Sequence, residues 1–351
     1  MAEASPPGPP HIVIHGAGSV GCYIGATWLA AGLSVSFLGR QEVKDEIAAN
    51  GLTVTDSERR RLEARPDEID FSTRPKALAR ADIVALCVKS NGTAAAAREI
   101  SRHARKGIAI LSFQNGISNA DALKAALPGF AVLRGMIPFN VARLGNGRWH
   151  KGVAGALWAE DHPVTRTLAE RIGKLGGGLR LAADMEGVAW GKLLINLNNA
   201  VNALSGKTLL EQLSDREYRR VVAASQVEAL EILEAAGIVP AQIGPIPPKL
   251  LPHVIAAPDL IFRNTVLKAQ KIDASARSSM ADDFAAGRET EIDYLNGEVV
   301  RLAHSLGRRA PVNERIVALV KQAEAGVELM WSAKDLRAHV LGGRAVPGFG
   351  Y

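Results

Sequence analysis

One lysine and several asparagines interrupt the apolar stretch Ala189–Asn202. Lys192 and Asn196 are four residues apart, so on a helix they share one face. Polar side chains in so apolar a helix are costly unless they meet water, a partner or a ligand. The spacing therefore indicates a polar wall that faces a ligand-binding cleft. The alternative is that the asparagines cap neighbouring elements while the lysine side chain extends to solvent.

A second group of polar residues includes Ser279, on a predicted helix that Gly287 ends. Thr290 has the residue type of a helix N-cap, so Glu291 is expected in the first turn of the next helix. The helix dipole there favours the ionised carboxylate. An ionised carboxylate is a suitable partner for a lysine that must stay protonated as a general acid. Glu291 is equally explained as an ordinary first-turn acid.

Three glycines in the spacing G-x-G-x-x-G follow a short β-branched run, Ile12–Ile14. In such a strand–turn–helix unit the first glycine permits the tight turn, the second lets the backbone approach a pyrophosphate, and the third lets helix and strand pack closely. The N–H groups at the start of the helix favour the same anion. The unit predicts dinucleotide binding, although a glycine-rich turn that binds nothing has the same pattern. The residues expected at the pyrophosphate are Gly16, Gly18, Ser19, Val20 and Gly21.

The end of the second strand, Leu33–Leu38, indicates which dinucleotide binds. A unit that binds NAD usually carries an acidic residue there, which bonds the ribose 2′-hydroxyl. Here Gly39 and Arg40 follow the strand. Gly39 leaves room, and Arg40 can pair with a 2′-phosphate. The sequence therefore favours NADP(H) over NAD(H), unless Arg40 is a solvated loop charge.

Strands and helices alternate after this unit, which specifies a parallel, doubly wound α/β sheet of the Rossmann type. Buried strands are predicted at residues 81–88 and 108–113, each followed by a helix. In such sheets ligands bind beyond the carboxyl ends of the strands. Lys89 and Asn115 stand at these ends and are therefore candidates for the site.

The pattern changes near residues 183–184, where the β signal disappears and helical spacing takes over. The second domain is therefore expected to be all-α. Residues 41–75 of the first domain are charged and irregular, and short strands separated by polar turns are expected there. The predicted divisions are a disordered tail over 1–10, an NADP-binding Rossmann domain over 11–183, a helical substrate and catalytic domain over 184–336, and a C-terminal tail over 337–351.

Composition and charge narrow the functional classes. The net charge of +6 is spread along the 351 residues without a basic block, which suits anionic small ligands better than nucleic acid. The eight histidines show no metal-ligand spacing, so no metal is expected. No run approaches the roughly 18 apolar residues that cross a bilayer. The two cysteines, in apolar surroundings, fit a reducing compartment, and we expect a cytoplasmic protein without a membrane partner.

Taken in order, these motifs resemble the ketopantoate reductase (2-dehydropantoate 2-reductase) family over residues 12–325. The resemblance implies an NADPH-dependent reduction of 2-dehydropantoate, a small 2-oxo acid, to (R)-pantoate, a step towards pantothenate and coenzyme A. The matching residues are the glycine turn, Arg40, Lys89, Gln114-Asn115-Gly116, Trp190-Gly191-Lys192 with Asn196, Ser278-Ser279-Met280 and Thr290-Glu291-Ile292-Asp293.

The resemblance also implies roles. Lys192 would be the general acid that protonates the carbonyl oxygen as hydride arrives at its carbon, and Glu291 would pair with and orient it. The resemblance further implies that Asn115 lies near the nicotinamide and the substrate, and that Lys89 supports the cofactor side of the cleft. Ser279 would bind the substrate carboxylate, and Asn196 would bond a substrate oxygen.

One position departs from the family pattern. The family commonly has a second asparagine eight residues after the lysine, where this chain has Ala200. The neighbouring Asn199 is a further substrate-binding candidate. A lost contact to a substrate hydroxyl would loosen specificity, so another branched 2-oxo acid is an alternative substrate. A non-catalytic NADP(H) sensor is the alternative from another class, although a sensor needs no paired lysine and carboxylate. The amphipathic helices of the second domain could serve a homodimer interface or an internal core.

Overall fold

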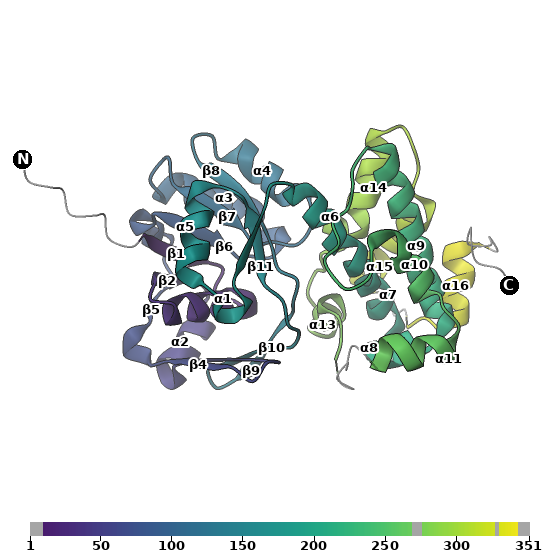
Figure 1. The fold of residues 1–351 in the computed structure, drawn as a ribbon, viewed down its shortest axis with the longest axis horizontal. Coiled ribbons are helices and arrows are strands. Elements are labelled where there is room, and N and C mark those ends of the chain that lie inside the picture. The colour runs from purple at the N-terminus through teal and green to yellow at the C-terminus, as the bar shows by residue number, and fades with distance from the viewer. Residues whose placement is uncertain (1–9, 269–275, 327–329, 343–351) are drawn as a thin grey trace, which may run out of the picture. The chain divides into compact units, whose positions relative to one another are not determined.

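The computed structural model describes residues 10–268, 276–326 and 330–342. The chain divides into two compact units, Met1–Met185 and Glu186–Tyr351 (Figure 1). This division lies two residues beyond the boundary predicted at 183–184. Most of the tail predicted over residues 1–10 lies outside the described residues.

The first unit is built on an eight-stranded sheet with the strand order β12-β11-β8-β7-β6-β1-β2-β5. All neighbouring strands are parallel except β11 and β8, which are antiparallel. The doubly wound parallel sheet is thereby confirmed, with one reversed pair. The strands are β1 (His11–His15), β2 (Ser34–Leu38), β5 (Asp70–Ser72), β6 (Ile83–Leu86), β7 (Ala109–Ser112), β8 (Ala131–Met136), β11 (Leu157–Glu160) and β12 (Leu179–Ala182).

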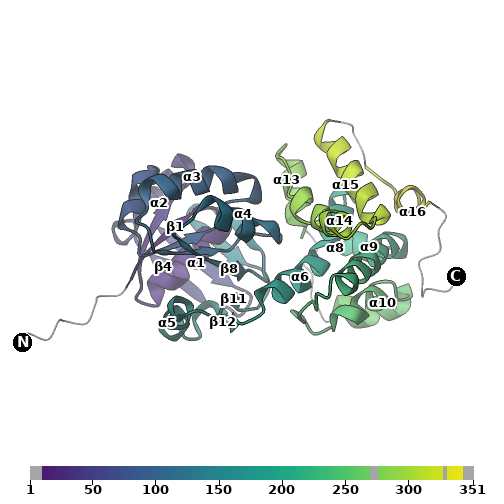
Figure 2. The same ribbon diagram turned by 90° about the horizontal axis from the view of Figure 1, so that it is seen from above.

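Helices cover both faces of this sheet, because successive strand residues point to opposite sides. Ile12 and Ile14 of β1 belong to one apolar cluster, and Val13 between them belongs to another. The first cluster includes residues of α1 and α5, and the second includes residues of α3 and α4. Figure 2 shows α3 and α4 on one side of the strands and α5 on the other. The bounds of the helices are α1 (Ser19–Ala30), α2 (Gln41–Asn50), α3 (Thr93–His103), α4 (Ser118–Ala126) and α5 (Pro163–Ile172).

A four-stranded sheet, β4-β3-β10-β9, packs beside α1. The irregular region 41–75 supplies two of its strands and also the helix α2, which the sequence pattern does not predict. Lys151 of β10 is fully buried, and its Nζ donates to the carbonyl oxygens of Gly155 (2.6 Å) and Gly176 (2.8 Å). The strands are β3 (Leu52–Asp56), β4 (Arg61–Ala64), β9 (Val141–Gly145) and β10 (Arg148–Lys151), and short helical turns lie at Pro66–Glu68, Pro75–Arg80, Ser90–Gly92 and Leu175–Gly177.

The described part of the second unit contains helices and turns but no strand, as predicted. Its apolar core is one cluster to which α7, α9, α13, α15 and α16 contribute. The helices are α6 (Met185–Asn196), α7 (Asn198–Ser205), α8 (Leu209–Ser214), α9 (Arg216–Ala235), α10 (Leu251–Ile255), α11 (Asp259–Phe262), α13 (Ser279–Ala285), α14 (Asn296–Ser305), α15 (Pro311–Glu324) and α16 (Ala333–Leu341), with shorter turns at Pro248–Leu250, Arg263–Leu267 and Ile292–Tyr294.

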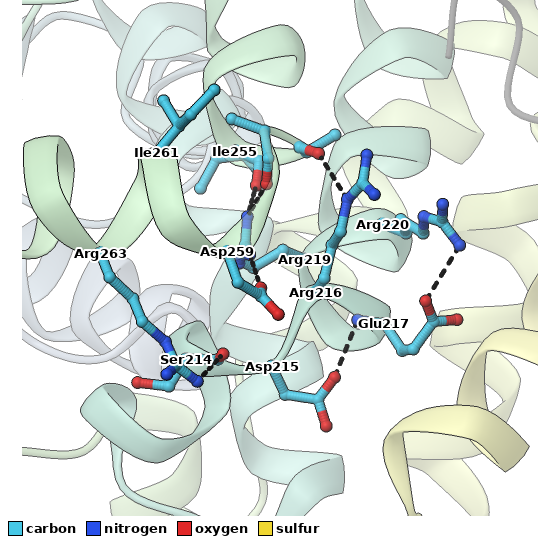
Figure 3. Close-up of polar contacts among 12 residues, drawn as sticks. Ser214, Asp215, Arg216, Glu217, Arg219, Arg220, Ile255, Asp259, Ile261 and Arg263 are labelled. Carbon is cyan, nitrogen blue, oxygen red and sulfur yellow. Dashed lines mark hydrogen bonds and ion pairs between the residues drawn. The ribbon is translucent and has the colours of Figure 1, made fainter. Parts of the chain in front are cut away.

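Arg219 ties α9 to the chain around α10 and α11 (Figure 3). Its guanidinium is fully buried and donates through Nη1 to the carbonyl oxygens of Ile255 (2.6 Å) and Ala257 (2.7 Å). It also pairs with the carboxylate of Asp259 and lies 4.2 Å from the ring centroid of Phe262. Bonds to carbonyls, a carboxylate and a ring together compensate for burying this charge.

Helix α16 crosses the predicted end of the helical domain at residue 336. Leu336 and Val340, one turn apart, are fully buried in the core of the unit, and Leu341 is also buried. The tail predicted over 337–351 therefore starts inside a packed helix, because an apolar pair at this spacing docks one helix face. Residues 343–351 lie outside the described residues.

Candidate active site

The three glycines of the turn after β1 differ in what surrounds them. Gly16 has a φ of +99°, and a Cβ there would lie 2.5 Å from the backbone nitrogen of Val88. A Cβ on Gly21 would overlap the carbonyl oxygen of Gly16, so this glycine permits close packing of α1 on the turn. A Cβ on Gly18 would meet nothing within 4 Å. Gly18 therefore borders open space at the N-terminus of α1.

That open space fits the pyrophosphate of a dinucleotide. Gly18 is the N-cap of α1, and Ser19 and Val20, the first helical residues, are partly exposed. The first turn of α1 carries no acidic residue that would repel an anion. Backbone N–H groups at a helix N-terminus, a favourable dipole and a glycine without a blocking side chain are what a phosphate group requires there.

Arg40 follows β2 and is the N-cap of α2. Its side chain is 74% exposed and pairs at 3.1 Å with Glu42, whose side chain is 55% exposed. Exposed pairs of this kind contribute about 0–1 kcal/mol, so Arg40 can exchange Glu42 for a phosphate at little cost. The space beside Gly39 is filled: a Cβ there would lie 2.9 Å from Cβ of Ala17 and 3.0 Å from Cζ of Phe71. Packing against Ala17 and Phe71 is therefore a second reason for a glycine at this position.

Lys89 and Asn115 stand at the carboxyl ends of β6 and β7, which are neighbours in the sheet. Lys89 is exposed and precedes the turn Ser90–Gly92, while Asn115 is half-buried. The glycine turn and Arg40 follow β1 and β2 in the same parallel run. The structure therefore brings all cofactor-binding candidates of the first unit to one edge of the sheet.

A buried polar network that the sequence did not indicate links the loops after β6 and β7. Asn119 donates through Nδ2 to Oγ of Ser90 (2.9 Å) and to the carbonyl oxygen of Asn115. Its Oδ1 accepts the hydroxyl of Thr93 (2.8 Å), which in turn accepts Nε2 of Gln114 (2.8 Å). Asn119 lies four residues after Asn115, and this spacing is the one signal that could have pointed to it. The network fixes both loops at the carboxyl edge of the sheet, where the candidate residues lie.

Lys192 and Asn196 lie on α6, as the sequence predicts. Asn196 is buried, whereas Lys192 keeps part of its side chain in contact with solvent. The protein around Lys192 removes most of its water, and this desolvation lowers the pKa of Lys192 to about 8. Such a lysine can donate a proton near neutral pH, where an acid–base catalyst is most effective. Close packing positions α6: a Cβ on Gly191 would overlap the carbonyl oxygen of Ala241.

The carbonyl oxygen of Asn199 accepts the hydroxyl of Ser278 (3.1 Å). Ser278 is the buried N-cap of α13, and its N–H donates to Oδ1 of Asn202 (2.9 Å). The next residue, Ser279, is exposed. Two asparagines of α7 thus hold the start of α13 and leave Ser279 accessible to a ligand. Ala200 is fully buried in the apolar core.

Glu291 does not lie in the first turn of an α-helix, which corrects the prediction. It precedes the short 3-10 turn Ile292–Tyr294, and α14 begins at Asn296, after a break at Leu295 (φ −117°, ψ −96°). The side chains at both ends of this segment donate hydrogen bonds to α15, Thr290 to Glu324 and Asn296 to Asn313. The backbone between them does not form a continuous α-helix. Tertiary hydrogen bonds outweigh helix propensity here.

In the described residues, no cluster of three or more histidine, cysteine, aspartate or glutamate side chains is arranged to hold a metal ion. Among the same residues, no helix has the length and apolar character to span a membrane.

Two regions of the chain match one protein family. "Ketopantoate reductase PanE/ApbA" matches residues 12–163, and "Ketopantoate reductase PanE/ApbA C terminal" matches residues 184–324. The matches cover most of both units and stop before α16.

Two relatives match the chain over different lengths. A 2-dehydropantoate 2-reductase of Halobacterium salinarum is 28% identical over 323 residues, which cover 89% of this chain and 98% of that protein. A 2-dehydropantoate 2-reductase of Pyrobaculum aerophilum is 32% identical over 225 residues, which cover 63% of this chain and 71% of that protein.

Solved structures share the fold. A PanE/ApbA family ketopantoate reductase from Ralstonia eutropha JMP134 has a TM-score of 0.76 at 27% identity, covering 90% of this chain and 99% of that one. A D-mandelate dehydrogenase solved with NADH and anilino(oxo)acetate has a TM-score of 0.72 at 19% identity, and the match covers 90% of this chain and 99% of that one. At that lower identity the likeness concerns the fold alone.

Proposed function

The chain belongs to the ketopantoate reductase family, and from that premise we propose that it reduces 2-dehydropantoate to (R)-pantoate with NADPH. As a member of this family it is an oxidoreductase that acts on CH–OH groups. The observation that carries the proposal is Lys192, a lysine whose burial lowers its pKa to about 8 on a helix that also holds Asn196.

In the proposed reaction, bound NADPH supplies the hydride to the C2 carbonyl carbon. Lys192 holds a proton at Nζ and donates it to the carbonyl oxygen, so the carbonyl becomes a hydroxyl and the lysine is left neutral until solvent reprotonates it. Its positive charge stabilises the developing oxyanion before the proton moves. Glu291 orients the lysine. Ser279, Asn196 and Asn199 bind the substrate's oxygens.

The choice of NADP(H) rests on Arg40. A guanidinium can form a bidentate pair with a 2′-phosphate, and its present partner Glu42 holds it weakly. No acidic side chain follows β2 directly, where a ribose 2′-hydroxyl would need one. Lys89 and Asn115 support the nicotinamide half of the cofactor at the neighbouring strand ends. The two thiols are free, and we place the enzyme in the reducing cytoplasm.

The second candidate is the reduction of another branched 2-oxo acid. Ala200, where the family commonly has an asparagine, is fully buried in the apolar core and offers no polar atom from its side chain. A site with one donor fewer for the substrate's hydroxyl discriminates less strongly against analogues that lack it.

The test follows the absorbance of NADPH, and separately of NADH, with purified protein and 2-dehydropantoate. We expect rapid oxidation of NADPH and much slower oxidation of NADH. Arg40→Ala should raise the KM for NADPH about 10- to 100-fold, the equivalent of a charge-assisted bond of about 1.5–3 kcal/mol, and leave the KM for NADH unchanged. Glu42→Gln, which removes the competing carboxylate, is the matched control and should not raise the KM for NADPH.

Other outcomes separate the alternatives. Turnover of other 2-oxo acids, with little of 2-dehydropantoate, would select the second candidate. Binding of NADPH without turnover of any 2-oxo acid would point to a sensing role. A preference for NADH would contradict the assignment of Arg40.

A further inference from the structure

The backbone next to Glu291 is attached to the end of α15. Glu324, the last residue of that helix, accepts two hydrogen bonds at Oε1 from Thr290: one from its N–H (2.7 Å) and one from its hydroxyl (2.8 Å). Thr290 is almost fully buried, and the side chain of Glu324 is 13% exposed. Charged hydrogen bonds at such a protected position are stronger than those in open solvent.

Thr290 in turn fixes the residues that follow it in the segment. Its Oγ1 accepts the N–H of Ile292 (3.2 Å), whose side chain is fully buried in the core. The carbonyl oxygen of Glu291 accepts the N–H of Tyr294 (2.9 Å). The backbone of Glu291 is therefore held on both sides, by a buried threonine before it and a buried isoleucine after it. Its own side chain stays partly exposed.

The other oxygen of Glu324 reaches the same segment from its far side. Oε2 lies 3.2 Å from Nζ of Lys321, one turn earlier on α15, and this ammonium lies 2.6 Å from Oδ2 of Asp293. One carboxylate thus connects to residues on both sides of Glu291. Replacing it by an amide would break the contact to Lys321, because two donors would then face each other.

Helix α15 is itself anchored at its other end. Glu228 of α9 accepts the N–H groups of Val312 (2.9 Å) and Asn313 (2.8 Å) in the first turn of α15. The side chain of Asn313 then accepts Nδ2 of Asn296 at the start of α14 (2.9 Å). Both ends of the segment 290–296 are thus fastened to one helix, whose N-terminus is capped by a carboxylate of another.

We propose that Glu324 is a positioning residue for the reduction: it holds the backbone on both sides of Glu291 so that the Glu291 carboxylate stays in place to orient Lys192. The proposal rests on the function proposed above, in which Glu291 is the partner of the general acid. Glu324 touches neither the substrate nor the cofactor in this account. A displacement of about 1 Å in a catalytic group can cost about 100-fold in rate, so a tether of this kind affects turnover without chemistry of its own.

The first variant is Glu324→Ala, compared with Glu314→Ala. Glu314 stands on the same helix but pairs with Arg309 and lies outside the segment 290–296. We expect Glu324→Ala to lower kcat about tenfold and to leave the KM for NADPH within about twofold, since the cofactor edge is untouched. The alkaline limb of the kcat profile should move to lower pH, because a misplaced carboxylate stabilises the lysine's proton less well. Glu314→Ala should change neither quantity.

Thr290 provides a second pair of variants in case Glu324→Ala does not fold. Thr290→Ser keeps the hydroxyl that bonds Glu324 and should retain the wild-type pH profile. Thr290→Val keeps the shape and loses the hydroxyl, so it should shift the alkaline limb in the same direction as Glu324→Ala but by less, because the N–H of residue 290 still donates to Glu324. Equal pH profiles for Ser and Val would overturn the proposal.

The decisive experiment is a double-mutant cycle with Glu291→Gln. If Glu324 acts through Glu291, Glu324→Ala should lower kcat by less than about twofold in the Glu291→Gln background, although it costs about tenfold alone. An equal loss in both backgrounds, or wild-type turnover of Glu324→Ala beside a slow Glu291→Gln, would overturn the positioning role and leave the proposed function intact. Wild-type turnover of Glu291→Gln itself would remove the role of Glu291, and this proposal with it.

Discussion

Replacing Lys192 by methionine should make the protein more stable and far less active. Burial lowers the pKa of Lys192 to about 8, against an ordinary lysine value of 10.5. At about 1.4 kcal/mol for each pH unit, this difference corresponds to about 3 kcal/mol by which the folded state disfavours the charged lysine. The figure is an upper bound, because the side chain keeps part of its surface in water. Methionine has a similar length and no charge to bury.

The sign of the pH dependence follows from the protons that each state binds. Folded Lys192 loses its proton near pH 8, and the unfolded chain loses it near 10.5. Between these values the unfolded state holds more protons, so the stability of the wild type rises with pH. The advantage of Lys192→Met is therefore largest below pH 8 and disappears as the pH approaches 10.5.

Thermal unfolding of both proteins, followed by the helical circular dichroism signal at neutral and at alkaline pH, measures this difference. For a unit of this size 1 kcal/mol corresponds to about 2–4 °C, so the gain at neutral pH should reach up to about 10 °C. Turnover should fall at least about 100-fold, the usual scale for loss of a general acid. Lys207→Met, at an exposed lysine of the same unit, is the control and should change neither stability nor turnover.

Three results would each refute part of this reasoning. A Lys192→Met protein no more stable than the wild type at neutral pH would show that burial does not penalise the charge. A gain that persists unchanged at alkaline pH would assign the effect to packing instead of ionisation. Near-normal turnover would separately refute the role of Lys192 as the acid.

Three further predictions concern the framework. Gly18→Ala should fold normally but raise the KM for NADPH, measured by NADPH titration, because its Cβ enters the open space at the N-terminus of α1. Gly21→Ala should instead lower the Tm in a melting curve, because its Cβ overlaps the carbonyl oxygen of Gly16. Arg219→Met should lower the free energy of unfolding, measured in urea, by about 3 kcal/mol or more, because two carbonyl oxygens and a carboxylate lose their hydrogen-bond donor. Asp259→Asn should lower it by about 1 kcal/mol or less, because Asp259 is half-exposed. Leu336→Ala should cost about 2–5 kcal/mol by the same measurement, because the side chain is fully buried in the core.

The sequence predicts the elements whose pattern is local. The glycine spacing, the buried strands 81–88 and 108–113 and the helix with Lys192 are each recognisable within a short window, because strand and helix periodicity and turn chemistry are properties of adjacent residues. The family motifs, taken in order, likewise identify the family, and the matched regions confirm it.

The errors occur where residues distant in sequence meet. The close packing of Gly39 against Ala17 and Phe71, which come from other parts of the first unit, has no local signal in the sequence. The four-stranded sheet pairs β3 with β10, about a hundred residues apart, and neither strand has a pattern that reveals its partner. The start of α14 is displaced because Thr290 bonds Glu324, 34 residues away.

By itself, the sequence determined the alternation of strands and helices around the main sheet, the glycine turn after the first strand and the identity of the candidate acid, since these follow from residue type and short-range spacing. Tertiary structure alone decided that Lys192 has a lowered pKa, that Asn119 holds two loops together, and that Glu324 fastens the segment of Glu291. The physical reason is common to all three. Desolvation and long-range hydrogen bonds depend on which distant side chains surround a group, and only folding brings those side chains together.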